Sequence, residues 1–297
     1  MNILNTPCLA AVALLAVLQS ALPQPSLAAA EPVRHRFLCV DNGRNQLIHV
    51  DQFQPGKSWA TPVPEGPRDL QILTGAGQKK RVLLSHGKGA TEYDLATGQP
   101  SGWTVDRYGG IQSAVRLPNG RTLLARVDGT VFEVDADGTE LGVIEPKAKV
   151  DIRLIRPLDN GNLLLSGAGV KALLEMKRDG EIVRRVPLSS KGYKAVQLPN
   201  GRYRSSMGDD CKVVELDAAG QVVAFVGGKT EHPDLGLDFS SGWDSLPNGN
   251  LVLCNWLGHG KQGTGCHLAE FTPDNKVVWT WQDHALARQV TNVKMIQ

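Results

Sequence analysis

The sequence predicts an all-β protein, a six-bladed antiparallel β-propeller closed by its C-terminal strand. Three observations support this fold: a Leu-Pro-Asn-Gly tetrapeptide that recurs about every 40 residues, short apolar runs separated by hairpin turns, and a β-like run without a hairpin partner at the end of the chain. Units of about 40 residues that hold four short strands each are typical of propeller blades.

The tetrapeptide marks the turn after the innermost strand of a blade. It occurs at Leu117–Gly120, Leu198–Gly201 and Leu246–Gly249, with the variant Leu-Asp-Asn-Gly at Leu158–Gly161. Each copy is followed by an apolar second strand and then by a third strand that ends in a turn such as Asp137-Gly138. Asn-Gly and Asp-Gly favour hairpins because these residues accept a positive φ. The repeat therefore predicts four blades.

Two further blades precede these four. Val82–His86 and Thr91–Leu95 belong to one, whereas Phe37–Asp41 and Gln46–Val50 belong to a first blade that begins without its inner strand. The run Val290–Gln297 has no hairpin partner, so we expect it to supply that strand. Such closure removes the strand edges that an open array exposes. The propeller is thus expected to span 31–297, and a sandwich of separate hairpins is the alternative.

Residues 1–30 are expected to be a signal peptide. They carry no charged side chain, Leu9–Leu18 is apolar, and Ala28 and Ala30 supply the small-x-small pattern of a cleavage site. The apolar run is shorter than the roughly 20 residues that span a bilayer. We therefore predict a periplasmic or secreted protein with no membrane span after cleavage.

Composition and motifs exclude several kinds of site. The 297 residues contain 32 Lys+Arg against 30 Asp+Glu, and no basic block occurs, so a nucleic-acid partner is not expected. The sequence has no His-x-His, Cys-x-x-Cys or Asp-x-Asp-x-Asp spacing and no phosphate-binding loop. We therefore expect neither a metal nor a cofactor.

The repeat resembles known bacterial propellers. The segment Leu-Pro-Asn-Gly-Asn-Leu, followed by Lys276-Val277-Val278-Trp279, is similar to the blades of arylsulfotransferase-related proteins, and Tyr93–Gln99 is similar to a PQQ-like repeat. The likeness covers nearly the whole mature chain and implies a propeller fold. Arylsulfotransferases use a histidine as the sulfate-accepting nucleophile, whereas the last inner strand here reads Gly242-Trp243-Asp244-Ser245. The resemblance therefore implies the fold and not sulfotransfer.

Two insertions break the repeat in the fifth and sixth blades. They are the connection Gly227–Ser241 and the glycine-rich loop Asn255–Gly265. In a propeller, the connection that enters an inner strand and the loop between the second and third strands lie on the same face. Long loops on a rigid scaffold are common binding sites. We therefore expect both insertions to rise over one rim and to mark the functional site.

Cationic, amide and aromatic side chains are expected to line the axial mouth of that face. They are Arg126, Arg153, Tyr193, Lys194, Trp243, Asn255, Trp256, His259 and Lys261. Guanidinium and ammonium groups suit carboxylate, sulfate or phosphate, and an indole suits a sugar ring. The sequence thus predicts a binding protein for a small polar ligand, either anionic or a saccharide.

Two other functions remain open on the sequence alone. One is a lyase or hydrolase that acts on a glycan-like substrate, with His259 or His232 as base and Arg153 and Lys194 holding charge; His86, across the funnel, is a third candidate. The other is a scaffold whose rim loops contact another protein.

Four cysteines follow the expected cleavage site. Cys254 ends one strand and Cys266 begins its hairpin partner, so a disulfide between them is the easiest of the three possible pairings. Cys39 and Cys211 belong to different blades and are expected to be buried thiols.

Overall fold

The computed structural model describes residues 31–75 and 79–296. The expected signal peptide, residues 1–30, lies outside the described residues. Within the described part of the chain, no helix has the length and apolar character needed to cross a membrane.

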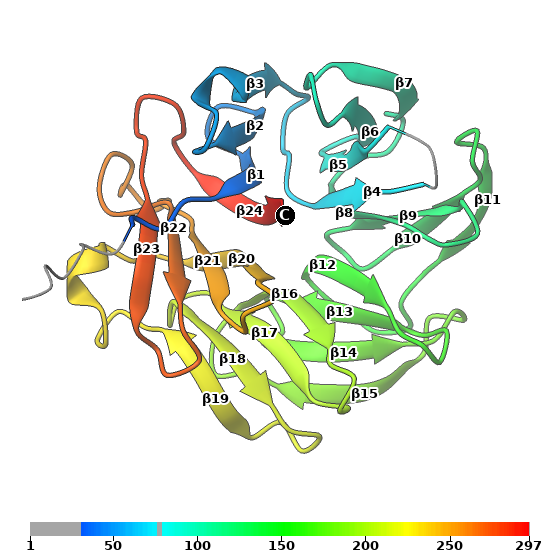
Figure 1. The fold of residues 1–297 in the computed structure, drawn as a ribbon. Helices are drawn as coiled ribbons and strands as arrows, with labels where there is room; N and C mark the ends of the chain where they lie inside the picture. The colour runs from blue at the N-terminus through cyan, green and yellow to red at the C-terminus, as the bar shows by residue number, and fades with distance from the viewer. Residues whose placement is uncertain (1–30, 76–78, 297) are drawn as a thin grey trace, which may run out of the picture. The chain divides into compact units, whose positions relative to one another are not determined.

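Six four-stranded antiparallel sheets form the blades (Figure 1). Blade 1 consists of β24 (Val290–Ile296), β1 (Arg36–Asp41), β2 (Gln46–Asp51) and β3 (Trp59–Pro62). Blade 2 consists of β4 (Leu70–Leu73), β5 (Arg81–His86), β6 (Gly89–Asp94) and β7 (Pro100–Val105). Blade 3 consists of β8 (Ile111–Arg116), β9 (Thr122–Arg126), β10 (Val131–Val134) and β11 (Glu140–Ile144).

The other three blades have the same strand order. Blade 4 consists of β12 (Ile152–Pro157), β13 (Leu163–Gly167), β14 (Ala172–Met176) and β15 (Ile182–Pro187). Blade 5 consists of β16 (Gly192–Gln197), β17 (Tyr203–Met207), β18 (Lys212–Leu216) and β19 (Val222–Gly227). Blade 6 consists of β20 (Ser240–Ser245), β21 (Leu251–Asn255), β22 (Leu268–Phe271) and β23 (Val277–Trp281). Short 3-10 turns occur at Pro55–Lys57 (η1) and Pro233–Leu235 (η2).

The innermost strands surround the axis. In ring order they are β4, β8, β12, β16, β20 and β24, each in contact with the next, and β24 contacts β4. The glycines of the four repeated turns, at 120, 161, 201 and 249, have φ values from 79° to 87°. That region favours glycine, which explains why the tetrapeptide ends in one. The predicted six-bladed all-β propeller is confirmed.

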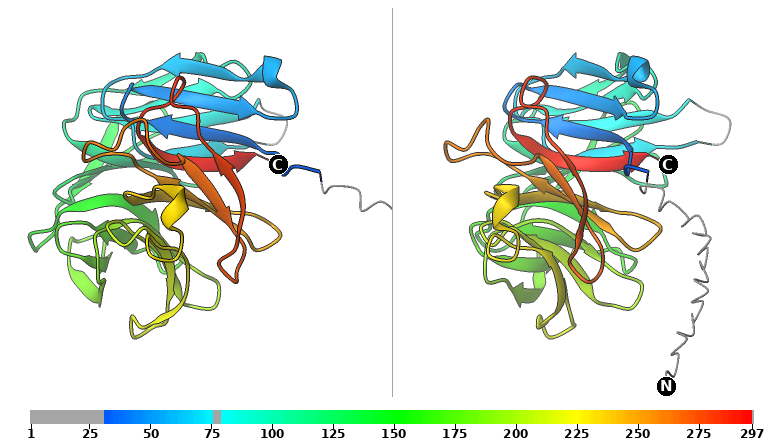
Figure 2. Two further views of the ribbon diagram at one scale, coloured as in Figure 1. Left: turned by 90° about the vertical axis from the view of Figure 1, so that its left-hand side faces the viewer. Right: turned by 60° about the vertical axis from the view of Figure 1, so that its left-hand side comes forward.

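The C-terminal strand closes the ring as predicted. β24 pairs antiparallel with β1, with Val293 opposite Cys39, and the two strands lie side by side in both views of Figure 2. The buried Asp41 carboxylate fixes the approach to β24, because it accepts the backbone N–H groups of Arg288 and Gln289 at 3.0 and 2.7 Å. The ring is thus closed both by the pairing of β24 with β1 and by the hydrogen bonds of the Asp41 carboxylate.

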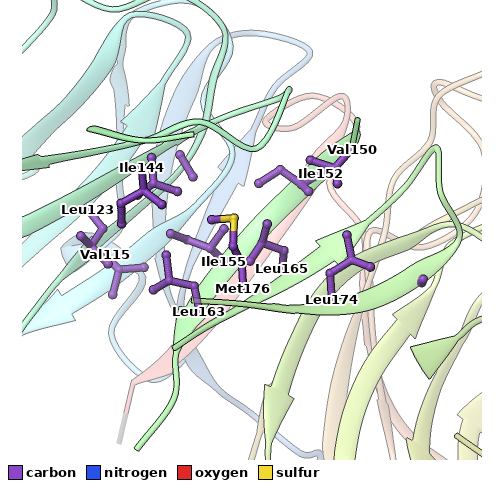
Figure 3. Close-up of a cluster of buried hydrophobic side chains, with 13 residues drawn as sticks. Val115, Leu123, Ile144, Val150, Ile152, Ile155, Leu163, Leu165, Leu174 and Met176 are labelled. Carbon is purple, nitrogen blue, oxygen red and sulfur yellow. The ribbon is translucent and has the colours of Figure 1, made fainter. Parts of the chain in front are cut away.

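The core is divided among the seams between blades. The described residues form six buried apolar clusters, and each one joins two neighbouring blades. Figure 3 shows the cluster between blades 3 and 4, where Val115 and Leu123 meet Ile155 and Leu165. Because each blade is held by packing on both sides, the ring is a rigid frame for the axis.

A repeated glutamate makes side-chain hydrogen bonds in five of the blades. Five third strands carry a glutamate at the equivalent position: Glu92, Glu133, Glu175, Glu215 and Glu270. Glu92, for example, accepts hydrogen bonds from Arg81 of its own blade and Arg116 of the next, at 2.5 and 2.8 Å. These carboxylates therefore stabilise the repeat.

A buried histidine lies beside the closing segment and makes stability depend on pH. Both ring nitrogens of His267 lack a hydrogen-bond partner among the described residues, and its ring centroid lies 4.7 Å from that of His284. Burial, followed by the neighbouring His284, lowers the pKa of His267 from 6.5 to about 4. Between pH 6.5 and 4, His267 is therefore neutral in the folded protein and protonated in the unfolded chain.

Acid is expected to destabilise the protein through His267. As the pH falls from 6.5 to 4, the unfolded chain gains a proton and the folded chain does not, so the free energy of unfolding should drop by about 3 kcal/mol. Urea titrations at several pH values measure this loss. His267→Phe should remove that part of the acid slope, and equal slopes for the variant and the wild type would contradict the assignment.

Candidate functional site

The two insertions lie together over blades 5 and 6. The connection between β19 and β20 contains η2, and the backbone N–H of Cys266 donates to the Leu235 carbonyl at 3.0 Å. The N–H of Trp256, in the loop between β21 and β22, donates to the Phe239 carbonyl at 2.8 Å. Both insertions therefore share the face at which inner strands begin, here named the insertion face. The opposite face, where the Leu-Pro-Asn-Gly turns lie, is named the turn face.

Asn255 holds the two insertions together. Its side chain is buried; its Oδ1 accepts the Asp238 N–H at 2.7 Å, and its Nδ2 donates to the carbonyls of Gly236 and Cys266 at 3.1 and 2.8 Å. The Asn255 amide, which was predicted to bind a ligand, thus makes its hydrogen bonds to backbone groups of the two insertions.

His259 belongs to an aromatic cluster on the insertion face. Its ring lies 5.1 Å from that of Trp256 and 6.4 Å from that of Phe239, and its Nδ1 lies 3.6 Å from Asp238 Oδ2. His259 has a positive φ of 47° and is exposed. The cluster presents an imidazole beside a carboxylate on the insertion face.

The predicted cationic residues of this face are divided among local contacts. Arg126 pairs with Asp128 two positions along the chain, and this contact lowers the pKa of Asp128 to about 2. Arg153 Nη1 lies 2.7 Å from Asp151 Oδ1. Lys261 is exposed in its loop. These three cations therefore lie in separate local environments, two of them paired with a nearby carboxylate.

Tyr193 and His86 are buried among protein groups, and His232 is half-buried. Tyr193 packs against Phe239 with ring centroids 6.5 Å apart. His86 Nε2 lies 3.2 Å from Thr91 Oγ1, and burial lowers the pKa of His86. The His232 ring packs 5.0 Å from that of Phe271. The three candidate catalytic histidines therefore lie in three separate environments.

The predicted disulfide is wrong. The four cysteines of the described residues are free, buried thiols. Cys254 packs with Leu268 in the cluster between blades 6 and 1, whereas Cys266 packs with Leu253 in the cluster between blades 5 and 6. The two thiols thus enter different seams and do not face each other. The expectation that Cys39 and Cys211 are buried thiols is confirmed.

A cavity of about 360 Å³ opens at the centre of the ring, towards the turn face. Every inner strand contributes to its wall, with one residue from each being Gln71, Ala114, Arg156, Lys194, Trp243 and Lys294. Leu198 of a repeated turn and Arg204 at the start of β17 line it as well. Since these positions end inner strands or begin second strands, the cavity lies at the mouth opposite the insertions.

A buried ion pair crosses the axis beside the cavity. Arg156 Nη1 and Nη2 donate to the two carboxylate oxygens of Asp69, each at 2.8 Å. The same carboxylate accepts the Ser113 hydroxyl at 2.5 Å and the Asn292 amide at 3.3 Å. Inner strands of three blades and the entry to β4 in a fourth thus meet at one carboxylate, which fixes the position of the Arg156 guanidinium.

Lys194 is the buried cation of the cavity wall. The residue is 8 % exposed, and its Nζ donates to the Trp243 carbonyl at 2.5 Å. Among the ion pairs of residues 31–75 and 79–296, none involves Lys194. Burial is the main cause that lowers the pKa of Lys194 to about 8. Its Nζ also lies 5.1 Å from the centre of the Trp243 ring.

Two further cations stand at the edge of the cavity. Lys294 Nζ lies 2.8 Å from Asp244 Oδ1. Arg204 shares Glu215 with Arg202 and donates to the Ser245 hydroxyl at 3.2 Å. Since two arginines share one carboxylate and Lys194 has none, the wall carries an excess of positive charge that an anion in the cavity would balance.

The sequence pointed to Lys194 and Trp243, but for the mouth of the insertion face, and Arg156, Arg204 and Lys294 were not predicted. A signal was present: β12, β20 and β24 each carry a charged residue within two positions of the strand's end, namely Arg156, Asp244 and Lys294. Charged residues on strands that converge at an axis indicate a polar channel along that axis.

Comparison with known proteins identifies the fold. No protein-family model and no curated protein matches the chain, so the resemblance to arylsulfotransferase-related and PQQ-like propellers is not confirmed. The chain is similar to a solved structure of a protein of unknown function from Bacteroides caccae, with 24 % identity and a TM-score of 0.71 over 89 % of this chain and 100 % of that one.

Two lyase structures are also similar. A streptogramin B lyase shares 13 % identity with a TM-score of 0.51 over 90 % of this chain and 96 % of that one. A catalytically inactive virginiamycin B lyase from Staphylococcus aureus with quinupristin shares 11 % identity with a TM-score of 0.54 over 86 % of each chain. Taken with the six sheets described above, these likenesses show that the chain adopts a six-bladed β-propeller fold.

Proposed function

We propose that this protein binds a small anionic ligand, such as a carboxylate, in the axial cavity of the turn face. The observation that carries the proposal is Lys194, a buried amine on the cavity wall with no carboxylate partner among the described residues. A buried ammonium is costly unless an opposite charge compensates it. A bound anion would supply that charge, and Arg204 and Lys294 stand where they can share it.

The anionic ligand is favoured over the saccharide. Trp243 is 3 % exposed, its Nε1 donates to the Lys194 carbonyl at 3.2 Å, and Lys194 and Arg204 lie beside its ring. Little of the indole is therefore free to stack on a sugar. The cavity volume is at the lower end of small-molecule sites, which suits a compact ligand.

Export is part of the proposal. It rests on the uncharged, apolar N-terminal segment with its small-x-small pattern. The protein would then bind its ligand in the periplasm or outside the cell. The position proposed for the anion site does not depend on export.

Anion binding should appear as thermal stabilisation with a defined pH dependence. Saturation at about 100 times Kd should add about 2.7 kcal/mol to the free energy of unfolding. Affinity should stay constant below pH 8 and then fall about tenfold for each further pH unit, because Lys194 loses its proton above its pKa of about 8. Thermal-shift titrations with lactate, succinate and sulfate measure this, with neutral sugars as controls. Stabilisation by sugars alone would contradict the proposal, and no response to any of them would favour a protein-interaction scaffold.

A lyase is the second candidate, and Lys194 is again the observation that favours it. An amine with a pKa of about 8 accepts protons at mildly alkaline pH, and nearby cations stabilise the charge that develops when a proton leaves the carbon beside a carboxylate. Two structures with a similar fold are lyases by name. The candidate bases His259, His232 and His86 are not among the residues that line the cavity.

Elimination from a uronate-containing glycan tests the lyase. The product carries a conjugated double bond, so ultraviolet absorbance should rise with time, more quickly as the pH approaches 8, and not at all with Lys194→Met. Constant absorbance with intact polyuronates would exclude this elimination and leave the binding function.

A further inference from the structure

The Lys194 amine has the geometry of a nucleophile. Lys194 lines the cavity, and its Nζ makes one hydrogen bond, to the Trp243 carbonyl, among the contacts of the described residues. A neutral amine can donate that hydrogen bond and keep its lone pair free. The group therefore needs no rearrangement to attack an electrophile in the cavity.

Burial is the main cause that favours a neutral amine. Among the surrounding charges, Asp244 and Asp69 favour the ammonium form, whereas Arg156 and Lys294 disfavour it. Asp69 is itself held by Arg156, and Asp244 by Lys294. Desolvation beside other cations is a known means of activating a lysine for attack on carbonyl compounds.

We infer that Lys194 forms a Schiff base with small 2-oxo acids that enter the axial cavity. This inference rests on the proposed anion site and names its ligand class. A 2-oxo acid carries a carboxylate, which Arg204 and Lys294 can hold, and an adjacent carbonyl carbon, which Lys194 can attack. A carboxylate without the carbonyl can bind and cannot condense.

The reaction balances without a further reactant. The neutral Lys194 amine adds to the carbonyl carbon and gives a carbinolamine, with one amine proton passing to the oxygen. Loss of that oxygen as water, with two protons from the amine in total, leaves a carbon–nitrogen double bond. No oxidation or reduction occurs in this step, which is reversible.

Reductive trapping tests the inference. The protein is incubated with pyruvate or 2-oxoglutarate and sodium cyanoborohydride, whose hydride fixes the imine as a secondary amine. Intact-mass spectrometry should show one added oxo acid minus one oxygen atom, and peptide mapping should place it at Lys194. Lys194→Arg should abolish the adduct, whereas Lys261→Arg on the insertion face should retain it. Adducts spread over exposed lysines at equal rates in both variants would overturn the inference.

The pH dependence distinguishes this inference from the anion site on which it rests. Trapping should accelerate between pH 6 and 8 as Lys194 deprotonates, whereas lactate affinity should fall above pH 8. If lactate protects against unfolding and no adduct forms, the Schiff base is refuted and the anion site stands. If neither lactate nor an oxo acid binds, both are refuted.

Discussion

Asp69→Ala should lower the free energy of unfolding by about 3 kcal/mol. The substitution removes the carboxylate that binds both Nη atoms of Arg156, and it leaves a guanidinium at the axis without its counter-charge. Breaking a buried pair in this way costs about 3–5 kcal/mol, and the lower end applies because Arg156 reaches the cavity and can be partly hydrated. Urea denaturation measures the change.

Asp151→Ala is the matched control for this prediction. Asp151 also pairs with an arginine of β12, Arg153, but both side chains are substantially exposed. Such a pair contributes less than about 1 kcal/mol. Equal losses for the two variants would contradict the view that the Asp69–Arg156 pair organises the axis.

Lys194→Met should weaken anion binding about 100-fold while leaving the free protein as stable as before or slightly more stable. The first effect follows because the ligand loses a charged hydrogen-bond donor, worth about 2–3 kcal/mol. The second follows because methionine replaces a buried amine that lacks a carboxylate partner among the described residues.

Calorimetry with lactate, combined with urea denaturation, measures both quantities. Lys261→Met, on the opposite face, is the control and should change neither. If Lys194→Met binds lactate normally, or if Lys261→Met loses binding, the ligand does not bind in the cavity of the turn face, and the proposed site is wrong.

The fold could be predicted from the sequence because its turns are chemically constrained. A positive φ is needed at Gly120, Gly161, Gly201 and Gly249, and this requirement leaves a visible repeat. The C-terminal strand could be predicted as well, since Val290–Ile296 is rich in residues that favour β-strands and has no local partner. Both inferences depend on local chemistry along the chain.

The cavity was harder to predict because it depends on register. β-Bulges interrupt the pairing of β12, β16 and β20, between Ile152 and Ile155, Gly192 and Ala195, and Ser240 and Trp243. Each bulge changes which side chains face the axis beyond it, so regular alternation does not reveal that Arg156, Lys194 and Trp243 share one wall. The predicted disulfide was wrong for a related reason, because the residue opposite Cys254 is Leu268, and Cys254 and Cys266 pack into different seams.

Titration of the Lys194 amine shows whether an anion site is built around this residue. With isotope-labelled lysine, the Nζ and Cε resonances that disappear in Lys194→Arg report its pKa in solution. We expect a pKa of about 8 in the free protein and a higher pKa when lactate saturates the site. A value near 10.5 both with and without lactate would show an ordinary solvated lysine, and would contradict an anion site built around it.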